Sequence, residues 1–82
     1  MVYYVALPFV HVTEGGLAPG QAVECANARA AVRRAEAMSR IEANSGAVAF
    51  SRQGNPDVGE FDDAVILKTF GEVPDDFGRA RA

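Results

Sequence analysis

VYYVALPFVHV, residues 2–12, is the stretch of sequence that decides the fold. β-branched and aromatic residues dominate it, which predicts a β-strand. One side of that strand would carry Tyr3, Val5, Leu7 and Phe9, and the other side Tyr4, Ala6, Val10 and Val12. Because a strand with one wet face alternates apolar and polar residues, we expect this strand to be buried on both faces. Pro8 cannot donate a ladder hydrogen bond, so it predicts either a sheet edge or a bulge.

A long helix is predicted next, from Gln21 to Asn44. No Gly or Pro interrupts this stretch, and eight of its first twenty-three residues are Ala, so helix propensity is high throughout. The helix is expected to stop at Asn44-Ser45-Gly46, residue types that tolerate the left-handed conformation. Cys25 would then lie one turn inside the helix.

Two further strands follow, at residues 46–52 and 64–70, separated by the polar loop 53–63. The resulting order is β-α-β-β. It predicts an α+β fold with a three-stranded mixed sheet and one long helix on one face. Residues 1–78 are expected to form a single domain, and residues 79–82 a frayed tail.

One helix can cover only one face of such a sheet, while both faces of the first strand are apolar. We therefore expect a homodimer to complete the core, by contact of sheet faces or of sheet edges. The alternative is that the long loop and the C-terminal segment fold over the second face of a monomer.

Composition excludes several classes of protein. The chain has 82 residues, 49% of them hydrophobic, and a net charge of −3, which is too apolar for a disordered chain. Its single Cys excludes a disulfide scaffold. No apolar run is long enough for a membrane span, and no secretory signal is evident, so we expect a cytoplasmic protein without membrane contact.

Charge is uneven along the chain. Residues 53–78 contain seven acidic residues and one Lys. This acidic C-terminal third argues against nucleic-acid binding, because Lys and Arg are needed to neutralise phosphates. The residues also predict no catalytic group, metal or cofactor: one His and one Cys cannot supply a zinc site, and a lone His needs an orienting partner that sequence cannot place.

Two sets of residues are candidates for binding. The leading set would contact a partner protein through an arginine stripe on the helix and the acidic loop, and consists of Arg29, Arg33, Arg40, Asp57, Glu60 and Asp62. The alternative set would form a small-ligand or active-site pocket at the dimer interface, and consists of Tyr3, Tyr4, His11 and Arg52. The sequence thus predicts a small non-enzymatic interaction protein, with a ligand-binding protein or enzyme as the alternative.

The stretch Ala49-Phe50-Ser51-Arg52, together with Gly59-Glu60-Phe61-Asp62-Asp63-Ala64-Val65, resembles a stretch of small uncharacterised bacterial proteins. That resemblance covers about half the chain and implies no activity and no site residue.

Overall fold

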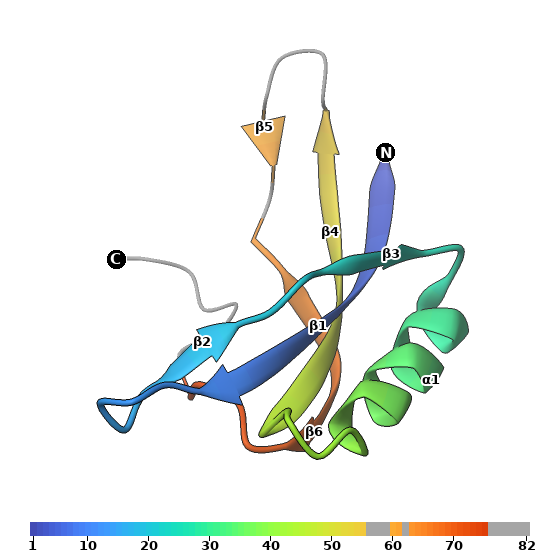
Figure 1. Cartoon of the computed structure of the whole chain (residues 1–82). Helices are drawn as coiled ribbons and strands as arrows, with labels where there is room; N and C mark the ends of the chain where they lie inside the picture. The colour runs from blue at the N-terminus through green and yellow to red at the C-terminus, as the bar shows by residue number, and fades with distance from the viewer. Residues whose placement is uncertain (56–59, 62, 76–82) are drawn as a thin grey trace.

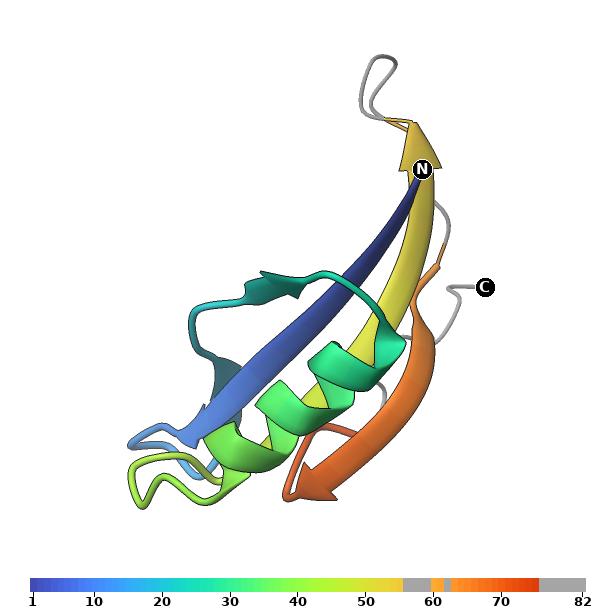
Figure 2. The same cartoon turned by 90° about the vertical axis from the view of Figure 1, so that its right-hand side faces the viewer.

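The computed structural model describes residues 1–55, 60, 61 and 63–75. Its elements in chain order are β1 (Val2–His11), β2 (Leu17–Pro19), β3 (Val23–Cys25), α1 (Ala28–Ser39), β4 (Gly46–Asn55), β5 (Glu60–Phe61) and β6 (Val65–Gly71). The chain is a small α+β protein in which α1 lies across one face of an antiparallel sheet (Figures 1 and 2). Within the described residues, no helix combines the length and the hydropathy needed to cross a membrane.

The predicted three-stranded mixed sheet is wrong. In the described part of the chain, five strands (β1, β2, β3, β4 and β6) form one sheet, and every pairing is antiparallel. β1 and β4 are the central pair. β2 and β3 pair with the side of β1 that faces away from β4, and β6 pairs with the side of β4 that faces away from β1. The short β5 pairs with the end of β4. After β1 the chain runs back along this strand as β2 and β3, and only then enters the helix. α1 therefore connects β3 to β4, which lie on either side of β1 and run parallel to each other.

The helix is shorter than the sequence predicts. It begins after Asn27, whose side-chain oxygen accepts a hydrogen bond from the backbone N–H of Ala30 at 2.8 Å, as expected of an N-cap. Residues 23–25 pair with β1 instead of joining the helix. At the other end α1 stops at Ser39, before the predicted stop, and none of Asn44, Ser45 and Gly46 takes the left-handed conformation on which that prediction rested. The Asn44 amide still donates to the carbonyl oxygen of Met38 at 2.9 Å.

Pro8 marks a bulge and not an edge. Ala6 pairs with Val23 and Phe9 pairs with Pro19, so two residues of β1 face three residues of the neighbouring segment. The carbonyl oxygen of Pro8 accepts a 2.7 Å hydrogen bond from Gly20. Since the N and the carbonyl of a strand residue point the same way, the missing N–H of Pro8 faces this irregular side. Pairing of β1 with β4 continues unbroken past Pro8.

Small residues bring α1 close to the sheet. Ala31 and Ala35 of the helix have no exposed surface, and neither do the sheet residues that they meet, Ala6, Ala47 and Ala49. Alanine side chains let a helix and a sheet approach closely without voids. Cys25, which was expected inside the helix, instead lies half-buried on β3 and packs against this cluster.

The second face of the sheet also has a buried centre. Phe9, Val48, Phe50 and Ala64 form this cluster, with Val73 of the segment after β6 packed against it. The prediction that β1 is buried on both faces is therefore confirmed: Ala6 is buried on the α1 side and Phe9 on the other. Among the described residues, the chain's own Val73 contributes to this cover, so a partner molecule is not needed at the centre of the second face.

Candidate functional site

A shallow groove of about 460 Å³ lies on the second face of the sheet, away from α1. It crosses three strands. Its lining residues are Tyr3 and Val5 of β1, Ala22 just before β3, Glu24 of β3, and Phe50 and Arg52 of β4. Both β1 and β4 extend beyond α1 at this end of the sheet (Figure 2).

The strand register explains why these side chains meet. Val5 lies opposite Glu24 on one side and opposite Phe50 on the other, and Tyr3 lies opposite Arg52. Directly opposed residues in antiparallel strands point to the same face of the sheet. The rows Glu24–Val5–Phe50 and Tyr3–Arg52 thus run side by side across the second face.

The groove has an apolar floor and two opposite charges at its sides. Val5 and Phe50 form the floor, and the Arg52 guanidinium stands 5.9 Å from the centre of the Phe50 ring, within the range of a cation–π contact. Glu24 is exposed on the opposite wall. Neither charge takes part in an ion pair with any described residue, so both remain available to a ligand.

The four residues predicted to form a pocket do not all converge. Tyr3 and Arg52 lie together in the groove. Tyr4 points to the opposite face of the sheet and packs beneath α1. His11 ends β1, eight residues beyond Tyr3, which at strand geometry is a separation of about 27 Å.

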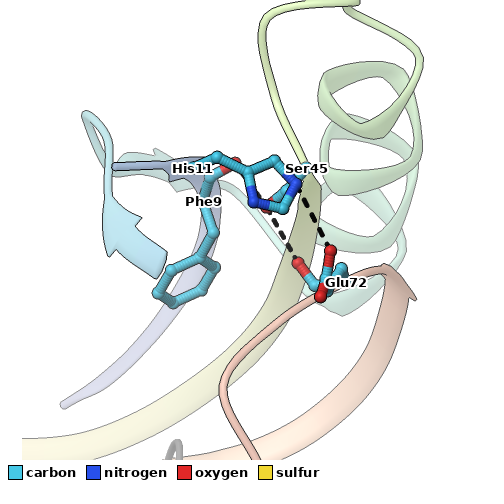
Figure 3. A network of polar contacts seen from close by, with 4 residues as sticks. All are labelled: Phe9, His11, Ser45 and Glu72. Atoms are coloured by element: carbon cyan, nitrogen blue, oxygen red, sulfur yellow. Dashed lines mark hydrogen bonds and ion pairs between the residues drawn. The ribbon is translucent and has the colours of Figure 1, made fainter. Parts of the chain in front are cut away.

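His11 belongs to a junction that ties three strands together (Figure 3). Its Nε2 lies 3.3 Å from a Glu72 carboxylate oxygen, and both side chains are more than 60% exposed. The Ser45 hydroxyl lies 3.1 Å from two backbone acceptors, the carbonyl oxygens of Phe9 and Glu72. Because the single hydroxyl proton is directed at the backbone, this serine serves as a structural donor and not as a nucleophile activated by His11.

The predicted partner-binding residues lie elsewhere. Arg29, Arg33 and Arg40 are exposed on α1 or its C-cap, and Arg40 pairs with Glu36 at 3.3 Å. Asp57 and Asp62 lie outside the described residues, as does the side chain of Glu60. The structure therefore places the arginine stripe on a free helix surface and does not describe its acidic counterpart.

Sequence reasoning missed Val5, Ala22, Glu24 and Phe50 as groove residues. Period-two counting along β1 places Tyr3 and Val5 on one face, and this signal was readable. Ala22 and Glu24 were missed because residues 21–26 were predicted to be helical, and the helical repeat of 3.6 residues places these two side chains on different sides of a helix.

No group of three or more metal-ligating side chains occurs in the part of the chain that the structure describes. Comparison with protein-family models, with curated proteins and with solved structures finds no match to this chain.

Proposed function

We infer that the protein is a small non-enzymatic binding protein that forms a homodimer through the β6 edge of its sheet. The observation that carries this proposal is a run of three exposed apolar residues on β6: Val65, Ile66 and Leu67 are 61%, 39% and 36% exposed. β6 pairs with β4 on one side, and its other side has no strand partner among the described residues. Unpaired backbone groups beside apolar side chains form a template for another strand.

The two edges of the sheet differ in how well they are protected. The β2–β3 edge is divided into two three-residue strands by the bulge at Pro8, which leaves little regular backbone for a partner. β6 is a seven-residue strand, interrupted by one register shift opposite Ala49 and Phe50. Its charged residue, Lys68, lies over the Phe70 ring at 5.3 Å on the α1 face, opposite Ala49. The β6 edge is thus the better candidate for strand addition.

Sedimentation velocity across the micromolar range tests the dimer. We expect a species of twice the 8.7 kDa chain mass. The double variant Val65→Lys, Ile66→Lys should sediment at the chain mass, because two ammonium groups per chain would repel across a twofold interface. Ile41→Lys is the matched control, since Ile41 is 55% exposed but lies outside β6, and it should remain dimeric. A wild-type protein that sediments at 8.7 kDa would refute the proposal.

The exposed arginines of α1 support recognition of an acidic protein partner by this dimer. Arg29 and Arg33 lie one turn apart on the helix, and neither pairs with a described carboxylate. Like charges so spaced disfavour the free helix slightly, and an acidic partner would relieve that repulsion. The proposal places the protein in the cytoplasm, where the unpaired Cys25 stays reduced.

A second candidate function is small-ligand binding in the groove at Tyr3 and Arg52. The groove volume of about 460 Å³ favours it, because small-molecule sites are commonly of that size and combine an apolar lining with a few polar groups. A thermal-shift screen with metabolites tests this function. A raised melting temperature that depends on Arg52 supports it, and a shift that persists in Arg52→Gln refutes this location.

A further inference from the structure

We propose that the groove binds a short apolar peptide whose two termini are free, with the peptide carboxylate at Arg52 and its ammonium group at Glu24. This inference deepens the second candidate function and rests on it. It starts from the charges at the two sides of the groove, which are opposite in sign and do not neutralise each other.

The separation of the two charges determines the kind of ligand. Glu24 and Arg52 belong to strands on either side of β1, which separates them by two strand spacings across the sheet. Arg52 also lies two residues further along the sheet than Phe50, the residue in line with Glu24, so the Cα atoms of Glu24 and Arg52 are about 12 Å apart. The side chains do not come within ion-pair distance. The two charges of a single amino acid are adjacent, whereas those of a peptide of two or three residues are separated by about 7–10 Å.

The floor of the groove suits the body of such a peptide. Val5, which is half-buried, provides apolar surface between the two charges, on which one apolar side chain can be buried. Phe50 is only 8% exposed and adds little to this surface. Polar groups in the middle of a ligand of the same length would find no hydrogen-bond partner on this apolar floor. The ligand is therefore apolar between its ends.

Arg52 is suited to hold a carboxylate. Its guanidinium is positioned over the Phe50 ring, and a planar guanidinium donates two parallel hydrogen bonds to a carboxylate. Tyr3, directly opposite Arg52, forms the wall beside the same end of the groove. Glu24 at the other end accepts hydrogen bonds from an ammonium group.

The test is a titration of the ¹⁵N-labelled full chain with the tripeptide Ala-Phe-Ala, followed by NMR chemical shifts. We expect shifts at the amides of Val5, Glu24 and Arg52. Removing one charge, by N-acetylation or by C-terminal amidation of the peptide, should weaken binding roughly fivefold to tenfold, as expected for loss of a charge-assisted hydrogen bond. If the blocked and free peptides bind equally, the two charges have no role and the proposal is overturned.

Two variants assign the ends of the peptide. Arg52→Gln should weaken binding of the free peptide to the level of the amidated one, and should leave binding of the amidated peptide unchanged. Glu24→Gln should do the same for the acetylated peptide. Arg34→Gln, on the exposed surface of α1, is the control and should bind as the wild type does.

The outcomes separate this proposal from the others. Shifts confined to β6 would mean that the peptide adds to the sheet edge, which overturns the groove assignment. No shifts with Ala-Phe-Ala would also overturn it, while a metabolite hit that depends on Arg52 would leave the second candidate function standing. The dimer is judged separately by sedimentation, since every groove residue here comes from one chain.

Discussion

Gly46→Ala is the substitution whose effect the structure determines most directly. Gly46 begins β4 and lies opposite Gly71 of β6. A Cβ atom added at Gly46 would collide with the carbonyl oxygen of Phe70 and would lie 2.5 Å from both the N and the O of Glu72. All three are backbone atoms, so no flexible side chain can move aside. The end of β6 must separate from β4 to make room.

The cost follows from what this separation breaks. Glu72 N–H donates to the Ser45 carbonyl oxygen at 3.0 Å, and the Ser45 hydroxyl lies 3.1 Å from the Glu72 carbonyl oxygen. Each such hydrogen bond contributes about 1 kcal/mol, and overpacking typically adds about 1–3 kcal/mol. We therefore expect Gly46→Ala to lower the free energy of unfolding by about 3–5 kcal/mol. A domain of this length has only about 4–12 kcal/mol in total.

Thermal and urea unfolding followed by circular dichroism measure this loss. At about 4–8 °C per kcal/mol, the melting temperature should fall by at least about 12 °C. Two other glycines provide matched controls. Gly16→Ala meets nothing closer than Val12 at 3.6 Å and should change stability by less than about 0.5 kcal/mol. Gly15→Ala has open space but a φ of +82°, so strain costs about 1–2 kcal/mol. A Gly46→Ala protein as stable as Gly16→Ala would refute the reasoning.

Two further substitutions test the helix and its packing. Asn27→Ala removes the N-cap acceptor of the Ala30 N–H and should cost about 1 kcal/mol in urea unfolding; Asn27→Asp keeps the acceptor and should cost little, so equal losses in the two variants would contradict the capping role. Ala35→Leu forces a larger side chain between α1 and the sheet, where Ala35 has no exposed surface, and should cost about 1–3 kcal/mol. Ala37→Leu, on the exposed side of the same helix, is its control, and a similar loss there would contradict the close packing of α1.

The helix shows where reasoning from sequence succeeded and where it failed. A helix in the alanine-rich stretch was predictable, because propensity summed over many residues is informative. Its start was misplaced because residues 21–26 also lack Gly and Pro, and local propensity did not reveal that Val23–Cys25 pair with β1. Asn27 was the available signal, since a side chain of this type commonly caps a helix.

The candidate groove shows the same division. Tyr3 and Arg52 were both predicted as pocket residues, and the register of β1 with β4 brings them together. The same prediction included Tyr4 and His11, which the sheet separates, one by facing α1 and the other by distance along the strand. Proximity of residues on one strand to residues on another depends on register, which no local pattern in this sequence specifies.

The sequence by itself determined that this protein is α+β and that its first strand is buried on both faces, because composition and period-two patterning are properties of each segment alone. The tertiary structure decided that the sheet is antiparallel throughout its described strands. It also decided that Pro8 lies at a bulge on a central strand and that Glu24 faces Arg52 across a groove. These features depend on which backbone hydrogen bonds form between segments far apart in the chain. Val23–Cys25 gain more from pairing with β1 than from extending a helix, and that competition is settled only when the strands meet.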